Sequence, residues 1–105
     1  MQPTVNIADV SRTAMLGSHR QLNYLIDACK GNDLKAQLQI YKILYKTMFN
    51  LSLGIVKDLV LAEYIMQESF LIAFEKIDSC CGIDSFVSRL KKIVETKSRN
   101  ILKNR

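Results

Sequence analysis

Between residues 58 and 77 small and apolar side chains recur every three or four positions, and this period constrains the fold more than any other feature of the sequence. The residues at this spacing are Ala62, Ile65, Met66, Ser69, Phe70, Ala73, Phe74 and Ile77. Such spacing places them on one face of an α-helix. Asp58 precedes the pattern and is a suitable N-cap, because its carboxylate can accept hydrogen bonds from the free amides of the first turn. The segment therefore predicts an amphipathic helix with one buried face.

Two earlier segments also have helical spacing. A short helix is expected over residues 20–30, with Gly31 as its stop; its apolar residues are Leu22, Leu25, Ile26 and Cys29. Asn32 or Asp33 is expected to cap a second helix from Leu34 to about Leu53, ended by Gly54. Its wide apolar stripe is expected to be largely buried; the stripe comprises Leu38, Tyr41, Ile43, Leu44, Tyr45, Met48, Phe49 and Leu53.

A last helix is expected after the segment SCCGID, capped by Asp84 or Ser85. Its inward residues are predicted to be Phe86, Leu90, Ile93, Val94 and Ile101, with basic residues facing outward. The sequence has no alternating pattern of useful length for a β-strand, and 105 residues suit one compact domain. We therefore expect an all-α bundle of three to four helices over residues 19–105, preceded by a loose arm over residues 1–18.

Nothing in the sequence indicates catalysis, a cofactor or a metal. Cys80 and Cys81 are adjacent, which is poor geometry for a disulfide and lacks the spacer of a zinc knuckle, so we interpret them and Cys29 as reduced thiols. His19 is the only histidine and has no second ligand or base near it in sequence. Phosphate-loop, GxSxG and HExxH motifs are missing. We expect a protein that is not an enzyme.

The N-terminus lacks the layout of a signal peptide, and no apolar run approaches the roughly 20 residues that span a bilayer. The expected location is therefore the cytoplasm, with no membrane span.

The positive charge is concentrated at the C-terminal end. Residues 89–105 contain seven of the fifteen basic residues and one of the ten acidic ones, Glu95. This concentration favours a polyanion such as a nucleic-acid backbone, because each cation set against a phosphate releases condensed counterions. The alternative is a solvated helix whose cations suit the negative end of its dipole, and charge alone does not decide between them.

The block VKDLVLAEYIMQESFLIAFEKID carries the most specific pattern, D-x-x-x-A-E-x-x-x-Q-E-x-F. Together with LIDACKGND before it and SFVSRL after it, this block resembles region 2 of bacterial sigma factors of the sigma-70 family, in particular the extracytoplasmic-function (ECF) group. The resemblance extends from about Leu22 to Arg105. It implies the helical fold of region 2 and a role in transcription initiation.

In that family the polar stripe of this helix docks on the clamp helices of the RNA polymerase β′ subunit, and the last helix with its preceding loop contacts the minus-ten promoter element. The resemblance assigns polymerase docking to Asp58, Glu63, Tyr64, Gln67 and Glu68. It assigns contact with promoter DNA to Arg89, Lys92, Thr96, Arg99 and Lys103. An anti-sigma factor would be a further partner.

The chain departs from the family pattern at three of these positions. Tyr64 replaces the usual aspartate of the docking stripe, Arg89 replaces a tryptophan and Thr96 replaces an asparagine. The last helix keeps Phe86 as its only aromatic residue, and the period places it in the core. Because unpaired bases are held largely by stacking, we expect little capacity for promoter melting.

No pattern for a second, helix-turn-helix domain follows the last helix, so we expect either an excerpt of a sigma factor or a stand-alone relative. A different class of function also stays open at this point. A helical interaction domain could associate with proteins only, for instance as a homodimer that buries exposed apolar residues such as Leu59 and Leu71.

Overall fold

The computed structural model describes residues 19–104, and these form an all-α bundle without strands. The arm expected over residues 1–18 lies outside the described residues, as does Arg105. The elements in chain order are α2 (His19–Lys30), α3 (Leu34–Val56), α4 (Leu59–Glu75), the 3-10 helix η2 (Ile77–Ser79) and α5 (Ile83–Lys103). The predicted fold class, an all-α bundle of three to four helices, is confirmed.

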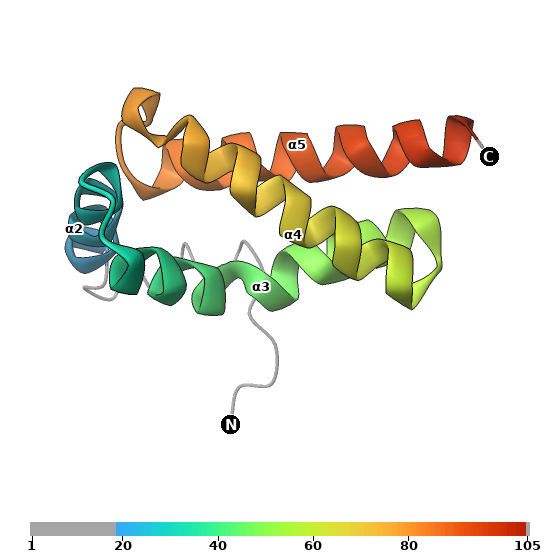
Figure 1. Ribbon diagram of the computed structural model, residues 1–105, viewed down its shortest axis with the longest axis horizontal. Helices are drawn as coiled ribbons and strands as arrows, with labels where there is room; N and C mark the ends of the chain where they lie inside the picture. Colours follow the sequence, from blue (N-terminus) through green and yellow to red (C-terminus); the bar gives the residue numbers. More distant parts are fainter. Residues whose placement is uncertain (1–18, 105) are drawn as a thin grey trace.

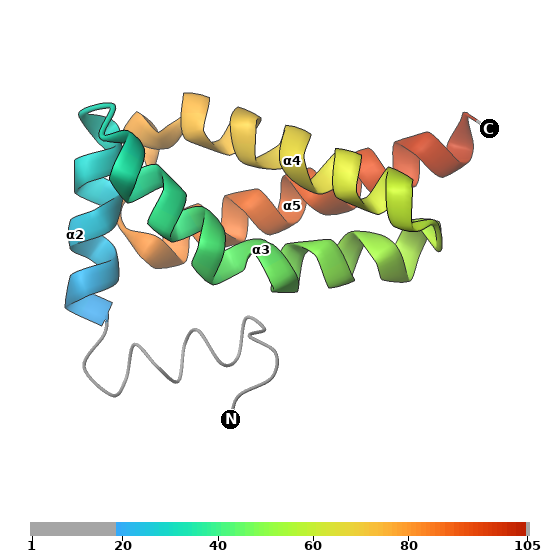
Figure 2. The ribbon, with the colours of Figure 1, turned by 60° about the horizontal axis from the view of Figure 1, so that its bottom comes forward.

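Three long helices make the body of the bundle (Figure 1). α3 and α4 form an antiparallel hairpin, and α5 returns alongside both of them. The short α2 lies across the end where α3 begins, and Figure 2 shows the same arrangement from a second direction. The outer faces of α3, α4 and α5 therefore point in different directions around one core.

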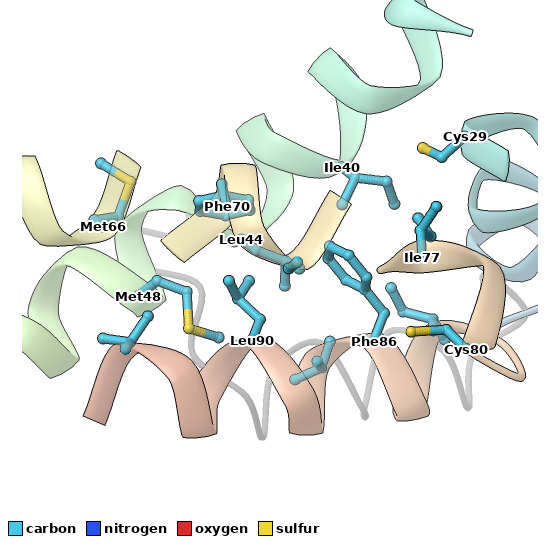
Figure 3. Close-up of a cluster of buried hydrophobic side chains, with 14 of the residues drawn as sticks. Cys29, Ile40, Leu44, Met48, Met66, Phe70, Ile77, Cys80, Phe86 and Leu90 are labelled. Atoms are coloured by element: carbon cyan, nitrogen blue, oxygen red, sulfur yellow. The ribbon is translucent and has the colours of Figure 1, made fainter. Parts of the chain in front are cut away.

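The core runs along the whole bundle and consists mainly of aliphatic side chains, methionine and phenylalanine (Figure 3). Phe86, Leu90 and Val94 of α5 are buried as predicted, whereas Ile93 and Ile101 are half-buried at the edge. One polar pair lies inside. The hydroxyls of Ser52 on α3 and Ser98 on α5 are hydrogen-bonded at 2.9 Å, which satisfies both groups away from water.

Two predicted N-caps are confirmed. The Asp33 carboxylate accepts from the amides of Lys35 and Ala36 at 3.0 and 3.2 Å. The Asp58 carboxylate accepts from the amide of Leu61 at 3.0 Å. Both carboxylates satisfy amides that a helix leaves free in its first turn.

The predicted end of α3 was wrong. Gly54 lies within the helix, which continues to Val56. The stop is Lys57, whose left-handed backbone, with φ of 56°, lets its amide donate to the Leu53 carbonyl at 2.8 Å. Glycine is the usual residue in this left-handed position at a helix end, but other residues can also occupy it.

The predicted start of α5 was also wrong, since the helix begins at Ile83 and neither Asp84 nor Ser85 is its cap. Gly82 occupies the cap position with φ of 117° and ψ of −173°, a conformation that is essentially restricted to glycine. The capping oxygen comes from a distant helix. Asn23 of α2 accepts from the Ile83 amide at 2.7 Å, so α2 stabilises the start of α5.

The third predicted helix stops earlier than its period suggested. α4 ends at Glu75, and Ile77 is buried from the 3-10 helix instead. None of the helices described, residues 19–104, combines the length and apolar character needed to cross a bilayer.

Candidate functional site

The outer face of α4 is exposed along its whole length. The opposite face is buried through Ala62, Ile65, Met66, Ser69, Phe70 and Ala73. Val60, Tyr64, Gln67 and Leu71 follow one another on the outer face at steps of four, three and four residues, and we call them the α4 seam. Val60 is 78% exposed, Tyr64 56% and Leu71 61%. This is the spacing of a helix that packs along another helix.

Polar residues flank the α4 seam on both sides. Gln67 donates to the Glu63 carboxylate at 3.3 Å, so these two predicted docking residues form a pair. Glu68 lies on the other side of Tyr64 and is half-buried. The structure therefore brings Glu63, Tyr64, Gln67 and Glu68 together around the exposed face of α4.

Asp58 has a different position from the other predicted docking residues. It is half-buried at the start of α4, and its carboxylate is engaged by the Leu61 amide. Its side chain therefore stabilises the helix that presents the α4 seam.

An apolar groove of about 420 Å³ borders the α4 seam between α3 and α4. It is lined by Leu34, Gln37, Leu38, Tyr41, Gln67, Phe70, Leu71 and Phe74. Leu34 is 74% exposed and Leu38 51%. The prediction that Leu38 belongs to the buried stripe of α3 was therefore wrong, because α4 packs beside this side chain and leaves it open to solvent.

Tyr41 forms part of this groove and packs edge-on against Phe70, with ring centroids 4.8 Å apart. Burial raises the pKa of its hydroxyl, and Tyr45 and the Glu63 carboxylate raise it further. The residue is therefore neutral at physiological pH, and the groove between α3 and α4 keeps an uncharged aromatic side.

Four of the five predicted DNA-contact residues lie on the exposed face of α5. Lys92, Thr96, Arg99 and Lys103 are all exposed and recur at steps of four, three and four residues. The buried face of the helix lies opposite them, with Leu90, Val94 and Ser98 in the core or at its polar pair. We call the four residues the α5 stripe, and its three cations lie along one side of the bundle.

Arg89 departs from this arrangement. It is half-buried, and its guanidinium donates to the Lys76 carbonyl at 3.0 Å and to the Ser79 hydroxyl. It therefore holds the segment that joins α4 to α5. Two open hollows adjoin it, one of about 560 Å³ with Ile72, Lys76, Asp78, Ser79 and Ile93, and one of about 340 Å³ with Ser85, Ser88, Lys92 and Ile93.

The three cysteines are free thiols, as predicted. Cys29 and Cys80 are buried and Cys81 is exposed. Burial, with the nearby Asp33 carboxylate, raises the pKa of Cys29 to about 11, so its reactive thiolate is scarce at neutral pH. Within residues 19–104 no three potential ligands among His, Cys, Asp and Glu come close enough to hold a metal ion.

Sequence reasoning missed two of these features. The groove between α3 and α4 had a signal in the sequence, since the apolar stripe of α3 is wider than one buried face requires. The contact of Arg89 with the Lys76 carbonyl had no signal in the sequence.

Comparisons of the chain with protein-family models, with curated proteins and with solved structures gave no match.

Proposed function

We propose that this chain is a transcription-initiation module of the kind found in region 2 of ECF sigma factors. In this proposal the outer face of α4 docks on the β′ clamp helices of core RNA polymerase, and the α5 stripe contacts minus-ten promoter DNA. Such a module acts in the cytoplasm, catalyses no reaction and needs no cofactor.

The observation that carries the proposal is the composition of the exposed α4 face. Its apolar residues Val60, Tyr64 and Leu71 have the spacing of a helix-packing seam, although no element within residues 19–104 covers them. α4 also carries three acidic residues and no basic one; the acids are Glu63, Glu68 and Glu75. A partner helix with apolar anchors and basic flanks complements such a face, and helix-on-helix docking is a common mode of recognition.

On the DNA side, Lys92, Arg99 and Lys103 are exposed on one face, which suits contact with successive phosphates. Phe86 is buried in the core, so α5 offers no exposed aromatic ring on which an unpaired base could stack. Binding through the α5 stripe would therefore position the DNA more than it melts the duplex.

A homodimer is the second candidate, and the exposed apolar residues of the α4 seam favour it. Charge opposes it in the simplest geometry. If two copies of α4 paired antiparallel with Val60 level with Leu71, the same register would set Glu63 level with Glu68 of the second copy. Like charges brought together in this way destabilise an interface.

The decisive experiment is retention of bacterial core RNA polymerase by the immobilised chain. The parent is expected to retain polymerase and Gln67→Ala with Glu68→Ala to lose it. Gln39→Ala with Glu95→Ala removes the same two functional groups from other helices, so this control is expected to behave as the parent. If neither the parent nor the control retains polymerase while the circular dichroism is helical, the proposal fails. A dimer in sedimentation would then favour the homodimer.

A further inference from the structure

The exposed side of α3 carries a line of basic and amide side chains that the proposed function does not use. Its members, which we call the α3 ladder, are Lys35, Gln39, Lys42, Lys46 and Asn50. All five are exposed, and they follow one another at steps of four, three, four and four residues. With a rise of 1.5 Å per residue, the α3 ladder extends over about 22 Å.

α3 itself contributes no acidic residue to the α3 ladder, since it contains three lysines and neither aspartate nor glutamate from Leu34 to Val56. The nearest acidic residues in the sequence are Asp33 and Asp58, just beyond the two ends of the helix. Each carboxylate accepts a hydrogen bond from a backbone amide. α4 has the opposite composition, with three acids and no cation. The positive charge of α3 therefore lies on its own side of the bundle.

We propose that the α3 ladder is a second DNA-binding surface, which holds the phosphate backbone of duplex DNA. Lysine ammonium groups neutralise phosphates, and asparagine and glutamine amides donate hydrogen bonds to phosphate oxygens. The ladder offers both kinds of donor along one line.

The composition of the α3 ladder selects duplex DNA among polyanions. Single strands are held largely by stacking of bases on aromatic rings, and the ladder has no aromatic member. An anionic membrane is held by apolar side chains that enter the lipid between the cations. In the α3 ladder the lysines are interspersed with the amides of Gln39 and Asn50. The exposed apolar side chains beside the ladder, Leu34 and Leu38, line the groove between α3 and α4.

The α3 ladder and the α5 stripe lie on different helices, and α3 and α5 pack side by side in both views (Figure 1, Figure 2). The chain would therefore have two tracks for nucleic acid. α3 would hold duplex DNA without reading its sequence, while α5 contacts the promoter element. This inference does not depend on polymerase docking.

The test measures fluorescence anisotropy of a labelled duplex between about 50 and 200 mM salt, the range over which counterion release dominates affinity. The variant is Lys35→Gln with Lys42→Gln in the full chain. The control is Lys30→Gln with Lys57→Gln, which lowers the net charge equally but changes lysines outside the ladder. Helical circular dichroism confirms that both variants fold.

If Lys35 and Lys42 each neutralise one phosphate, the slope of log K against log salt falls by about 1.8 for the variant. The loss of affinity between the two salt concentrations then shrinks by roughly tenfold. The control slope is expected to change much less, and affinity for a single strand is expected to be equal for variant and control.

Three results would overturn the inference. One is a failure of the expected salt dependence, either because the slope for the variant equals that of the control or because salt does not affect duplex binding by the parent. A second is an equal loss on single strands, which would assign the lysines to a different nucleic acid. A third is unchanged duplex binding with lost binding to vesicles containing phosphatidylserine, which would assign the α3 ladder to a membrane.

Discussion

Gly54 and Gly82 are expected to respond in opposite ways to the same substitution. Gly54 lies within α3, and a Cβ added there would meet no atom within 4 Å. Gly82 precedes α5 with φ of 117°, and a Cβ there would lie 2.7 Å from the Asn23 side-chain oxygen. That oxygen is the one that caps α5 through the Ile83 amide.

The magnitudes follow from these two geometries. Alanine in the interior of a helix is more favourable than glycine by roughly 0.5 to 1 kcal/mol, so Gly54→Ala should stabilise the protein by about that amount. Gly82→Ala imposes a backbone conformation that costs on the order of 1 to 3 kcal/mol. It also displaces the Asn23 cap, and a lost cap costs about 1 kcal/mol. We expect Gly82→Ala to destabilise by roughly 2 to 4 kcal/mol.

The assay is urea unfolding followed by far-ultraviolet circular dichroism, which gives the free energy of unfolding for each variant. Adding Asn23→Ala completes a double-mutant cycle, because it removes both the cap and the clash. Gly82→Ala should then cost less in the Asn23→Ala background than in the parent. A neutral Gly82→Ala, or equal costs in both backgrounds, would refute the argument from the Gly82 backbone and the Asn23 cap.

Three further predictions concern the buried hydroxyls of Ser52 and Ser98, the buried thiol of Cys29 and the exposed thiol of Cys81. Ser52→Ala or Ser98→Ala alone should destabilise the protein by about 1 to 3 kcal/mol, because each leaves a buried hydroxyl without its partner. The double variant should cost less than the two single costs added together. Additive costs in urea unfolding would contradict this prediction. Burial holds the pKa of Cys29 at about 11 in the folded protein, above its ordinary value of 9.0. The unfolded state therefore loses this proton at a lower pH than the folded state. The free energy of unfolding should accordingly fall as pH rises from about 9 to 11. The fall should be smaller in Cys29→Ala, and an equal pH profile would remove Cys29 as its cause. Cys81 is exposed and should be alkylated by iodoacetamide in the native protein while Cys29 reacts only on unfolding, which mass spectrometry of the labelled peptides would report.

The parts of the fold that could be predicted from sequence are those set by neighbours along the chain. Asp33 and Asp58 cap the helices that directly follow them, so their roles are visible in the order of residues. The start of α5 was not visible, because the Asn23 oxygen that caps it comes from 60 residues earlier. Leu38 was predicted to be buried because it belongs to the apolar stripe of α3, but it is exposed. The period identifies the stripe and does not show which of its residues the neighbouring helices cover.

The same limit applies to the candidate site. The period alone predicts that Gln67 lies on the outer face of α4 and Lys92 on that of α5, and both are exposed. It also placed Arg89 among the outward residues, but Arg89 binds the carbonyl of Lys76, in the irregular segment after α4. An irregular segment has no repeating residue pattern, so a contact with it cannot be predicted from the spacing of residues in the sequence.

The Asn23 cap has a consequence for the order in which the chain folds. The hairpin of α3 and α4 is closed by two residues, Lys57 and Asp58, and can form from local contacts. The capped start of α5 requires that α2 and α5 meet across the whole hairpin, and the entropy of closing so long a loop is lost before the hydrogen bond forms. We expect the first turn of α5 to order late in folding. In native-state hydrogen exchange, the Ile83 amide should accordingly open more readily than amides in the middle of α3.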